Sequence, residues 1–290
     1  TAEEYQQQNI GMQRFNQILG QLIETQNKLF ACEDTEKKKT LLDQISDLKN
    51  MIVMHQLYGC SDDIIEKYQR TRKATSKPYV LWQLDFAKVF KEKGGFDIVI
   101  GNPPYIQLQK SISDESDIKL GDLYVNQKFE TFAKTGDIYC LFYEKGWRLL
   151  RKEGILSFIT SNKWMRAGYG EKMRSFLTSR TNPIQLIDFA GQKIFESATV
   201  DVNILIFSKN KNEGSTKACV AREGCRDNLS VFVHQNCTEM SFSGLDSWTV
   251  LSPIEMSIKK KIEAVGTQLK DWDISINYGI KTGYNDAFII

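Results

Sequence analysis

The sequence lacks the features that would place it in a membrane, secreted or disordered class. None of its apolar runs approaches the roughly 20 residues that a membrane-spanning helix needs, and residues 1–9 are polar rather than signal-like. Six cysteines are scattered over 290 residues without a Cys-x-x-Cys pair, which favours reduced thiols over a disulfide framework. With 41% hydrophobic and 26% charged residues, the composition is that of a globular protein with one large or two ordinary domains. We therefore expect a cytoplasmic protein with no membrane partner.

Metal ligands and net charge also carry little information. Only one cluster invites comparison with a zinc site: Cys219, Cys225, His234 and Cys237. Its spacing lacks the close pairs of structural zinc sites, so loop cysteines are the default interpretation and no metal is expected. A net charge of +2 indicates no partner, but residues 143–180 hold nine Lys or Arg against three Asp or Glu, so basic charge is concentrated there.

The most informative stretch is residues 96–105, Phe-Asp-Ile-Val-Ile-Gly-Asn-Pro-Pro-Tyr. Its β-branched apolar run begins after two glycines and ends at two prolines, which predicts a short strand buried on both faces. Asn102 then follows the carboxyl end of the strand, where open α/β sheets bind their ligands. Because Pro103 and Pro104 fix φ and remove two backbone donors, the acceptors beside them are held in one extended shape.

These residues suit chemistry on a planar amino group. The side-chain oxygen of Asn102 and a proline carbonyl can accept both hydrogens of an NH2 group, while Tyr105 offers its ring a flat face. Such a nitrogen is a poor nucleophile because its lone pair is delocalised. Acceptors that draw it towards tetrahedral geometry stabilise the transition state more than the ground state, so no catalytic base is required. A tight turn after a strand is the alternative interpretation.

Asn102-Pro103-Pro104-Tyr105 after a strand resembles the motif of amino-methyltransferases that use S-adenosylmethionine. The resemblance is strongest over residues 79–207 and is closest to DNA adenine-N6 methyltransferases of the TaqI-like, type IIG restriction-modification kind. It implies an α/β, Rossmann-like methyltransferase sheet, S-adenosyl-L-methionine as cofactor, double-stranded DNA as partner and a flipped adenine as substrate. It also implies that these four residues are catalytic.

The resemblance assigns roles to further residues. It implies that the cofactor contacts Asp85, Phe86, Asn102, Pro104 and Phe142. Asp85 would accept a hydrogen bond from the adenine amino group of the cofactor, and Phe86 and Phe142 would lie against its ring. Phe195 would stack on the flipped base opposite Tyr105. The alternatives are a helix cap for Asp85 and core aromatic residues for Phe142 and Phe195.

Basic residues follow an expected strand at residues 155–160. We expect DNA-backbone contacts at Lys163, Arg166, Lys172 and Arg174, because such charges neutralise phosphates and fix register without reading sequence. A solvated basic helix is the alternative.

Three parts are expected along the chain: a helical hairpin at 1–76, the catalytic half of a methyltransferase domain at 77–209, and a linker with the start of a target-recognition domain at 210–290. Helical spacing predicts two helices in the first part, the second capped by Asp34 or Thr35, and a third helix after Ser61. The polar residues 106–136 are expected to form a lid with little apolar surface to bury. The other expected elements are strands at 79–86, 184–189, 200–207, 231–233 and 248–251, and helices at 137–150 and 253–265.

No glycine-rich turn or ribose-binding carboxylate precedes Asp85, although a complete enzyme of this kind needs both. We therefore expect an excerpt without its cofactor-binding half, which alone binds S-adenosylmethionine weakly. Residues 276–290 resemble the opening of a target-recognition domain. The chain shows no nuclease motif, and whether the full-length chain carries a nuclease domain stays open.

Two other interpretations stay open. Methylation of a protein glutamine or an RNA guanine uses the same four residues on the same kind of amino group, although Phe195 and the closing Gly-x-x-Thr-Gly favour DNA. Alternatively, the chain is a DNA-binding specificity or scaffold module without activity, for which the missing glycine turn is the best argument. The sequence upstream would discriminate between these interpretations.

Overall fold

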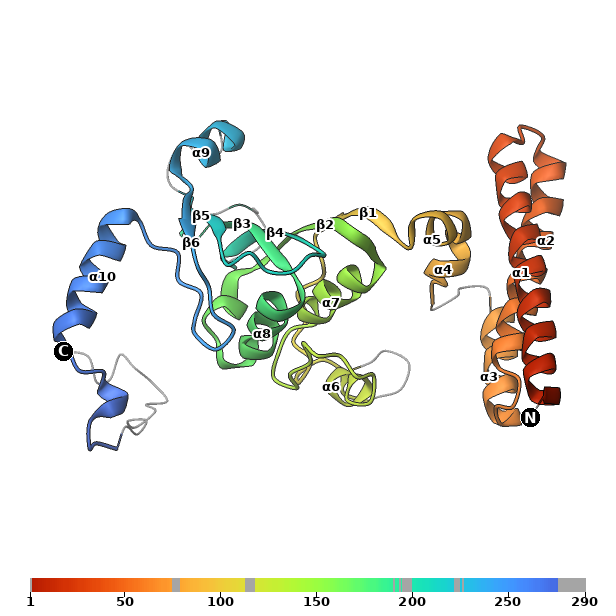
Figure 1. Cartoon of the computed structure of the whole chain (residues 1–290), viewed down its shortest axis with the longest axis horizontal. Helices are drawn as coiled ribbons and strands as arrows, with labels where there is room; N and C mark the ends of the chain where they lie inside the picture. The colour runs from red at the N-terminus through yellow and green to blue at the C-terminus, as the bar shows by residue number, and fades with distance from the viewer. Residues whose placement is uncertain are drawn as a thin grey trace.

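The computed structural model describes residues 2–74, 79–112, 118–189, 191–192, 194, 200–221, 225 and 227–275. Figure 1 shows a helical hairpin at one end, a central sheet with helices beside it, and a C-terminal helix at the other end. The expected α/β class is therefore confirmed. None of the helices in the described ranges is long and apolar enough to cross a membrane.

The N-terminal helices form as the apolar spacing predicts. They are α1 (Ala2–Ala31), α2 (Thr35–Gln56) and α3 (Asp62–Lys73). Asp34 caps α2, since its side chain accepts a hydrogen bond of 3.0 Å from the amide of Lys37. The apolar faces of α1 and α2 pack together around Leu22 and Ile52, which are fully buried.

The expected strand at 79–86 is wrong. This segment contains the short helix α4 (Trp82–Asp85), and α5 (Ala87–Lys93) follows it and ends at Gly94, whose φ is 76°. The reason is tertiary, because Leu84 and Ala87 pack on the apolar cluster of the hairpin. Leu84 lies in α4 and Ala87 begins α5, so both short helices contact the hairpin.

Within the described residues, the central sheet has six strands in the order β1-β2-β4-β3-β5-β6. The strands are β1 (Phe96–Gly101), β2 (Leu150–Ser161), β3 (Asn182–Asp188), β4 (Val202–Ser208), β5 (Thr216–Val220) and β6 (Thr238–Met240). The pairs β1/β2 and β3/β5 are parallel, and β4 runs antiparallel between β2 and β3. The strands β1, β2 and β3 consequently end at the same edge of the sheet.

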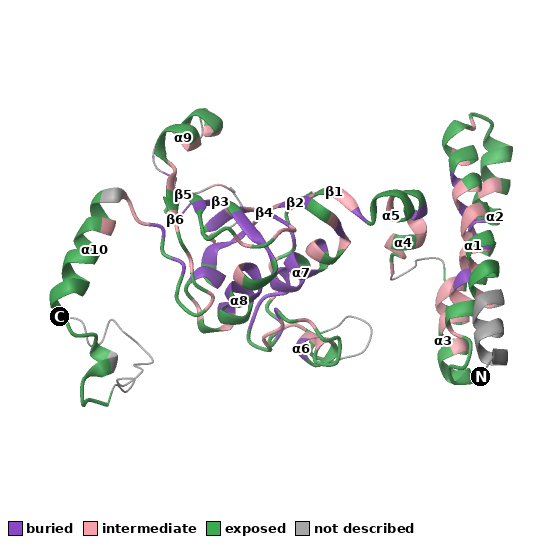
Figure 2. Cartoon of the chain, in the orientation of Figure 1, coloured by how far each residue is buried: buried purple, intermediate pink, exposed green. Residues whose placement is uncertain are grey.

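Burial of β1 on both faces was expected and is wrong. Ile98 and Ile100 are 64% and 78% exposed, whereas Val99 packs on the main core cluster. The structure describes β1 as an edge strand that pairs with β2 alone, so only one of its faces is covered. Figure 2 shows that the buried residues gather in the middle of the sheet and in the helices beside it.

The helices beside the sheet are α7 (Tyr139–Leu149) and α8 (Glu171–Arg180), and between β2 and α8 lie the short η1 (Asn162–Met165) and η2 (Gly168–Gly170). The α7 helix and the strands β2, β3 and β4 confirm the predicted elements of this region. The core between them includes Tyr143 and Trp164, which are fully buried.

The described part of the loop between β1 and α7 buries more apolar surface than expected. It contains α6 (Leu120–Tyr124), and its described residues form an apolar cluster around Leu108, Ile138 and Leu141. The expectation that this loop has little apolar surface to bury is wrong, because Phe129 and Phe132 pack on the cluster that contains Leu108, which lies more than 20 residues earlier in the sequence.

The last part contains α9 (Leu229–Asn236), α10 (Pro253–Val265) and η3 (Leu269–Asp271). The α10 helix confirms the helix predicted at 253–265, and Ser252 with Glu255 forms a capping box at its start. The expected strands at 231–233 and 248–251 are wrong. The first lies within α9, which the Asn228 side chain caps, and the second is irregular around the buried Trp248. Residues 276–290 lie outside the described residues.

Candidate functional site

At the carboxyl edge of the sheet, the segments that follow β1, β2 and β3 lie close together. Gly101 at the end of β1 is paired with Phe158, three residues before β2 ends at Ser161. Asp188 at the end of β3 is paired with Asn203 of β4, and Ser161 is paired with Val202, the neighbouring residue of β4. The segments that follow β1, β2 and β3 therefore leave the sheet side by side, which is the arrangement that binds ligands in open α/β sheets.

Residues 102–105 leave β1 with alternating exposure. Asn102 and Pro104 are exposed, Pro103 is buried and Tyr105 is half-buried. The Tyr105 ring packs on both main core clusters and meets the Tyr139 ring edge to face at a centroid distance of 6.1 Å. The segment is thus anchored by Pro103 and Tyr105 and presents the Asn102 amide to solvent.

The Tyr105 hydroxyl is buried and has no hydrogen-bond partner among the described residues. Burial raises its pKa, so the hydroxyl stays neutral. An unpaired buried hydroxyl is costly and marks a position where a further partner would be favourable.

Tyr139, whose ring contacts Tyr105, belongs to a hydrogen-bonded chain of side chains. The Tyr169 hydroxyl donates to Asp137 at 3.0 Å, and the hydroxyls of Tyr139 and Tyr169 are 2.8 Å apart, so Tyr139 donates to Tyr169. Burial raises the pKa of both tyrosines. Sequence reasoning missed these three residues. Only Tyr169 had a signal, the isolated Gly-x-Gly around it, and that signal does not indicate this role.

A buried carboxylate stands at the end of β3. Asp188 is fully buried, accepts a hydrogen bond of 2.8 Å from the Asn162 amide and pairs with Arg166 at 3.3 Å. This pair ties the turn after β2 to the end of β3. Arg166 therefore has a structural partner, although 54% of its side chain is exposed.

The basic residues expected to contact DNA fall into two groups. Lys163 and Lys172 are exposed beside the carboxyl edge, and Arg166 is partly exposed. The expectation for Arg174 is wrong, because it is only 3% exposed and donates to the carbonyls of Trp164 and Ala167. Burial also lowers its pKa. A buried guanidinium that donates to two backbone carbonyls is not available to a phosphate.

The structure separates the residues expected to contact the cofactor. Phe142 lies in the first turn of α7 and is 39% exposed. Phe86 packs on Phe96 at the amino end of β1, so six strand residues, about 20 Å at ~3.3 Å each, separate this end from Asn102. Asp85 pairs with Lys49 of α2. Asp85 and Phe86 are thus not brought to the carboxyl edge.

The remaining candidates from the sequence are Phe195 and the possible metal ligands. Phe195 lies outside the described residues. Within the described ranges, no group of three or more His, Cys, Asp or Glu side chains could hold a metal ion. Cys219 and Cys237 do lie together, with sulfur atoms 2.9 Å apart.

A family model described as Eco57I restriction-modification methylase matches residues 7–195, more than half of the chain. The chain belongs to this family. The match includes β1 and residues 102–105, and it extends over the helical hairpin and the turn after β2. Membership in the Eco57I family thus covers every element that builds the carboxyl edge up to the end of β3.

Individual relatives are distant. The type II methyltransferase M.BstVI of Geobacillus stearothermophilus is 25% identical over 232 residues, which are 73% of this chain and 40% of that protein. The restriction enzyme and methyltransferase RM.Eco57I of Escherichia coli is 28% identical over 118 residues, 41% of this chain and 12% of that protein. The type IIL restriction-modification enzyme MmeI in complex with DNA is 15% identical with a TM-score of 0.40, over 61% of this chain and 23% of that chain. The chain thus spans less than half the length of these relatives.

Proposed function

We propose that the chain is the catalytic part of a restriction-modification DNA methyltransferase that methylates the N6 amino group of adenine. One observation carries the proposal: the exposed Asn102 directly follows a parallel strand, on a backbone fixed by Pro103 and Pro104. Membership in the Eco57I restriction-modification methylase family supports the reaction class.

In this proposal the residues after β1 act on the target amino group. The side-chain oxygen of Asn102 and a proline carbonyl accept its two hydrogens and favour a tetrahedral nitrogen in the transition state. The Tyr105 ring supplies a flat face for the base and is itself held by two core clusters. Bound S-adenosylmethionine would supply the electrophilic methyl group. The amino group loses its proton to solvent after transfer, so no catalytic base is needed.

The candidate residues fit the cofactor in part. Asn102 and Pro104 are exposed beside the carboxyl edge, and Phe142 offers a partly exposed aromatic face suited to an adenine ring. Asp85 does not fit this role in the described structure, because Lys49 neutralises its carboxylate and it lies at the other end of β1. For the cofactor we therefore propose the first three residues and not Asp85 or Phe86.

The DNA would contact the surface that follows β2. Lys163, Lys172 and the exposed part of Arg166 would neutralise phosphates. The adenine must leave the duplex to reach Asn102, which costs a few kcal/mol of unstacking, and Phe195 with Tyr105 would offset that cost by stacking. A nuclease domain in the same full-length chain, which the type IIG assignment implies, is supported by the name of RM.Eco57I.

The test is the identity of the methylated product. The full-length protein is incubated with isotope-labelled S-adenosylmethionine and, separately, with duplex DNA, RNA and bacterial protein, and each acceptor is digested and analysed by mass spectrometry. The proposal expects N6-methyladenine in DNA. Label in a protein glutamine or an RNA guanine would replace the adenine assignment, and no transfer to any acceptor would favour the specificity module without activity.

A further inference from the structure

Two cysteines meet where β5 and β6 pair. The last pair of the ladder is Ala218 with Thr238, so Cys219 and Cys237 are the next two residues along the antiparallel strands and stand opposite each other. Their sulfur atoms are 2.9 Å apart, closer than non-bonded sulfur atoms normally approach, although both cysteines are free. Opposite residues of antiparallel strands have Cα atoms about 4.5–5.5 Å apart, which is within the range that a disulfide spans.

We propose that Cys219 and Cys237 form a reversible disulfide, a modification site separate from the carboxyl edge. The pair lies just beyond the β5/β6 ladder, and its two cysteines are 18 residues apart in sequence with α9 between them. None of the residues of α9 is buried, and Figure 1 shows this helix projecting beyond the sheet. The disulfide would add a covalent link between the end of α9 and β5 to the apolar contacts that Leu229, Phe232 and Val233 make with the cluster around Cys219.

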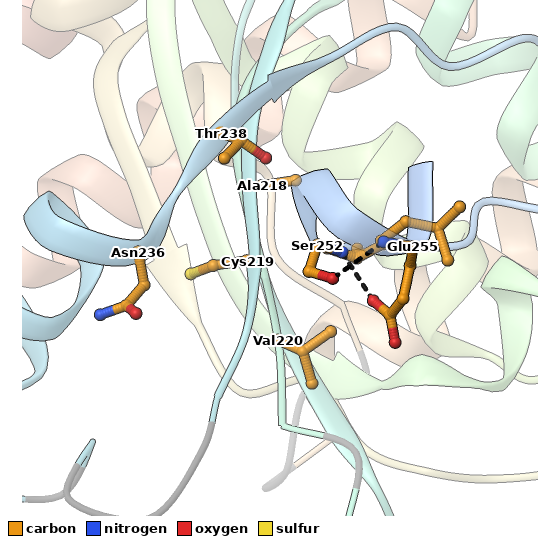
Figure 3. A pocket seen from close by; sticks show the side chains of 9 residues that line it. Ala218, Cys219, Val220, Asn236, Thr238, Ser252 and Glu255 are labelled. Atoms are coloured by element: carbon orange, nitrogen blue, oxygen red, sulfur yellow. Dashed lines mark hydrogen bonds between the residues drawn. The ribbon is translucent and has the colours of Figure 1, made fainter. Parts of the chain in front are cut away.

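The surroundings of the pair give a small oxidant access to it. Cys219 is only 4% exposed and packs in an apolar cluster, whereas Cys237 is half-buried. A cavity of about 280 Å³ opens beside the strand pair and is lined by Cys219 and by both sequence neighbours of Cys237, Asn236 and Thr238. Figure 3 shows the Cys219 sulfur on the side of β5 that faces Asn236, away from the start of α10. The junction is therefore accessible to a small molecule.

The reaction is a thiol–disulfide exchange with an oxidised low-molecular-weight disulfide, RSSR. The more exposed Cys237 thiolate attacks RSSR and releases one RS⁻, which leaves a mixed disulfide on Cys237. Cys219 loses its proton to solvent and attacks the Cys237 sulfur, which releases the second RS⁻. The two protein sulfur atoms are oxidised and one RSSR is reduced to two thiols. Burial raises the pKa of Cys219, so the more exposed partner is the one that reacts first.

Peptide mapping under non-reducing conditions tests the proposal on the 290-residue chain. The protein is equilibrated with glutathione and glutathione disulfide in defined ratios, free thiols are blocked, and trypsin is added. Trypsin cleaves after Lys217, Arg222, Arg226 and Lys259, so the three nearby cysteines fall in three different peptides. We expect one linked pair, residues 218–222 with 227–259, whose mass is lower by two hydrogen atoms than the sum of the separate peptides.

Two variants sharpen the test. Cys225→Ser should keep the linked pair, because Cys225 is the buried neighbour in the same cluster and not the partner. Cys60→Ser removes an exposed thiol elsewhere and should also keep it. Amide exchange in residues 229–236 should slow severalfold on oxidation and recover on reduction. A linkage through Cys225, or two separate peptides at the most oxidising ratio, would overturn the proposal.

Discussion

Replacement of Gly170 by alanine should destabilise the turn that follows β2 more than any ordinary surface change. A Cβ at Gly170 would lie 1.9 Å from the carbonyl oxygen of Trp164 and 2.7 Å from its carbonyl carbon. The clash is with backbone, and the same oxygen accepts a hydrogen bond of 2.8 Å from buried Arg174. The Trp164 side chain is fully buried and packs against Trp248, so the backbone has little freedom to retreat.

The expected cost follows from overpacking. Such substitutions lower the free energy of unfolding by about 1–3 kcal/mol, and we expect about 3 kcal/mol here because the clash is with fixed backbone. At roughly 2–4 °C per kcal/mol for a domain of this size class, the melting temperature should fall by about 10 °C.

Gly168→Ala is the matched control in the same short helix. Gly168 is exposed, and a Cβ there meets nothing within 4 Å, so its effect should stay within about 1 kcal/mol. The measurement is thermal unfolding of both variants and the wild type, followed by tryptophan fluorescence. Equal melting temperatures for the two variants would refute the close approach of η2 to η1.

Three further results are expected. Arg174→Met should lower the free energy of unfolding by about 1–3 kcal/mol because the buried Trp164 carbonyl loses its donor, while the Ala167 carbonyl keeps its hydrogen bond from the Gly170 amide. Lys172→Met should leave stability unchanged and lower the slope of the DNA-binding constant against salt concentration, on logarithmic scales, by about one. In urea denaturation, Tyr169→Phe should cost about 1–3 kcal/mol through the unpaired carboxylate and hydroxyl behind Tyr105, and Tyr58→Phe, at a side chain 92% exposed, should cost nothing measurable. Because burial raises the pKa of Tyr139 in the folded state, stability should be fully present below about pH 10, the ordinary tyrosine pKa, and fall as pH rises above it. Loss of stability in alkali that is unchanged in Tyr139→Phe would contradict the last expectation.

Local patterns in the sequence predict the elements that local forces form. The helices of the hairpin, β1 and α10 follow from apolar spacing and capping residues such as Asp34 and Ser252. The error at 79–86 is tertiary in origin, because this short apolar segment packs on the hairpin. The error at 231–233 missed a local signal, the Asn228 side chain that caps α9. The exposed face of β1 is also a matter of neighbours, which a six-residue run does not specify.

The site was predictable in its centre and not at its edges. The prolines fix the backbone locally and the apolar run before Asn102 predicts a strand, so the position of Asn102 after a strand could be inferred. Asp188 and Asn162 are 26 residues apart, and their hydrogen bond depends on strand order. Likewise, nothing in the sequence around Arg174 distinguishes a buried guanidinium from a solvated one, because its partners are backbone carbonyls of a turn formed by other residues.

The most direct test of the central claim separates cofactor binding from methyl transfer in Asn102→Ala of the full-length protein. Asn102 is exposed and is proposed to act on the amino group, so its loss should reduce methyl transfer by about 10²–10³-fold, the usual effect of one lost transition-state contact. Cofactor affinity by calorimetry should fall far less than methyl transfer, because Pro104 and Phe142 keep their proposed contacts with the cofactor, and the melting temperature should stay close to that of the wild type. Asn16→Ala, an exposed asparagine in α1, serves as the control for the substitution itself. Turnover equal to that of the control, with cofactor affinity lost, would contradict the account.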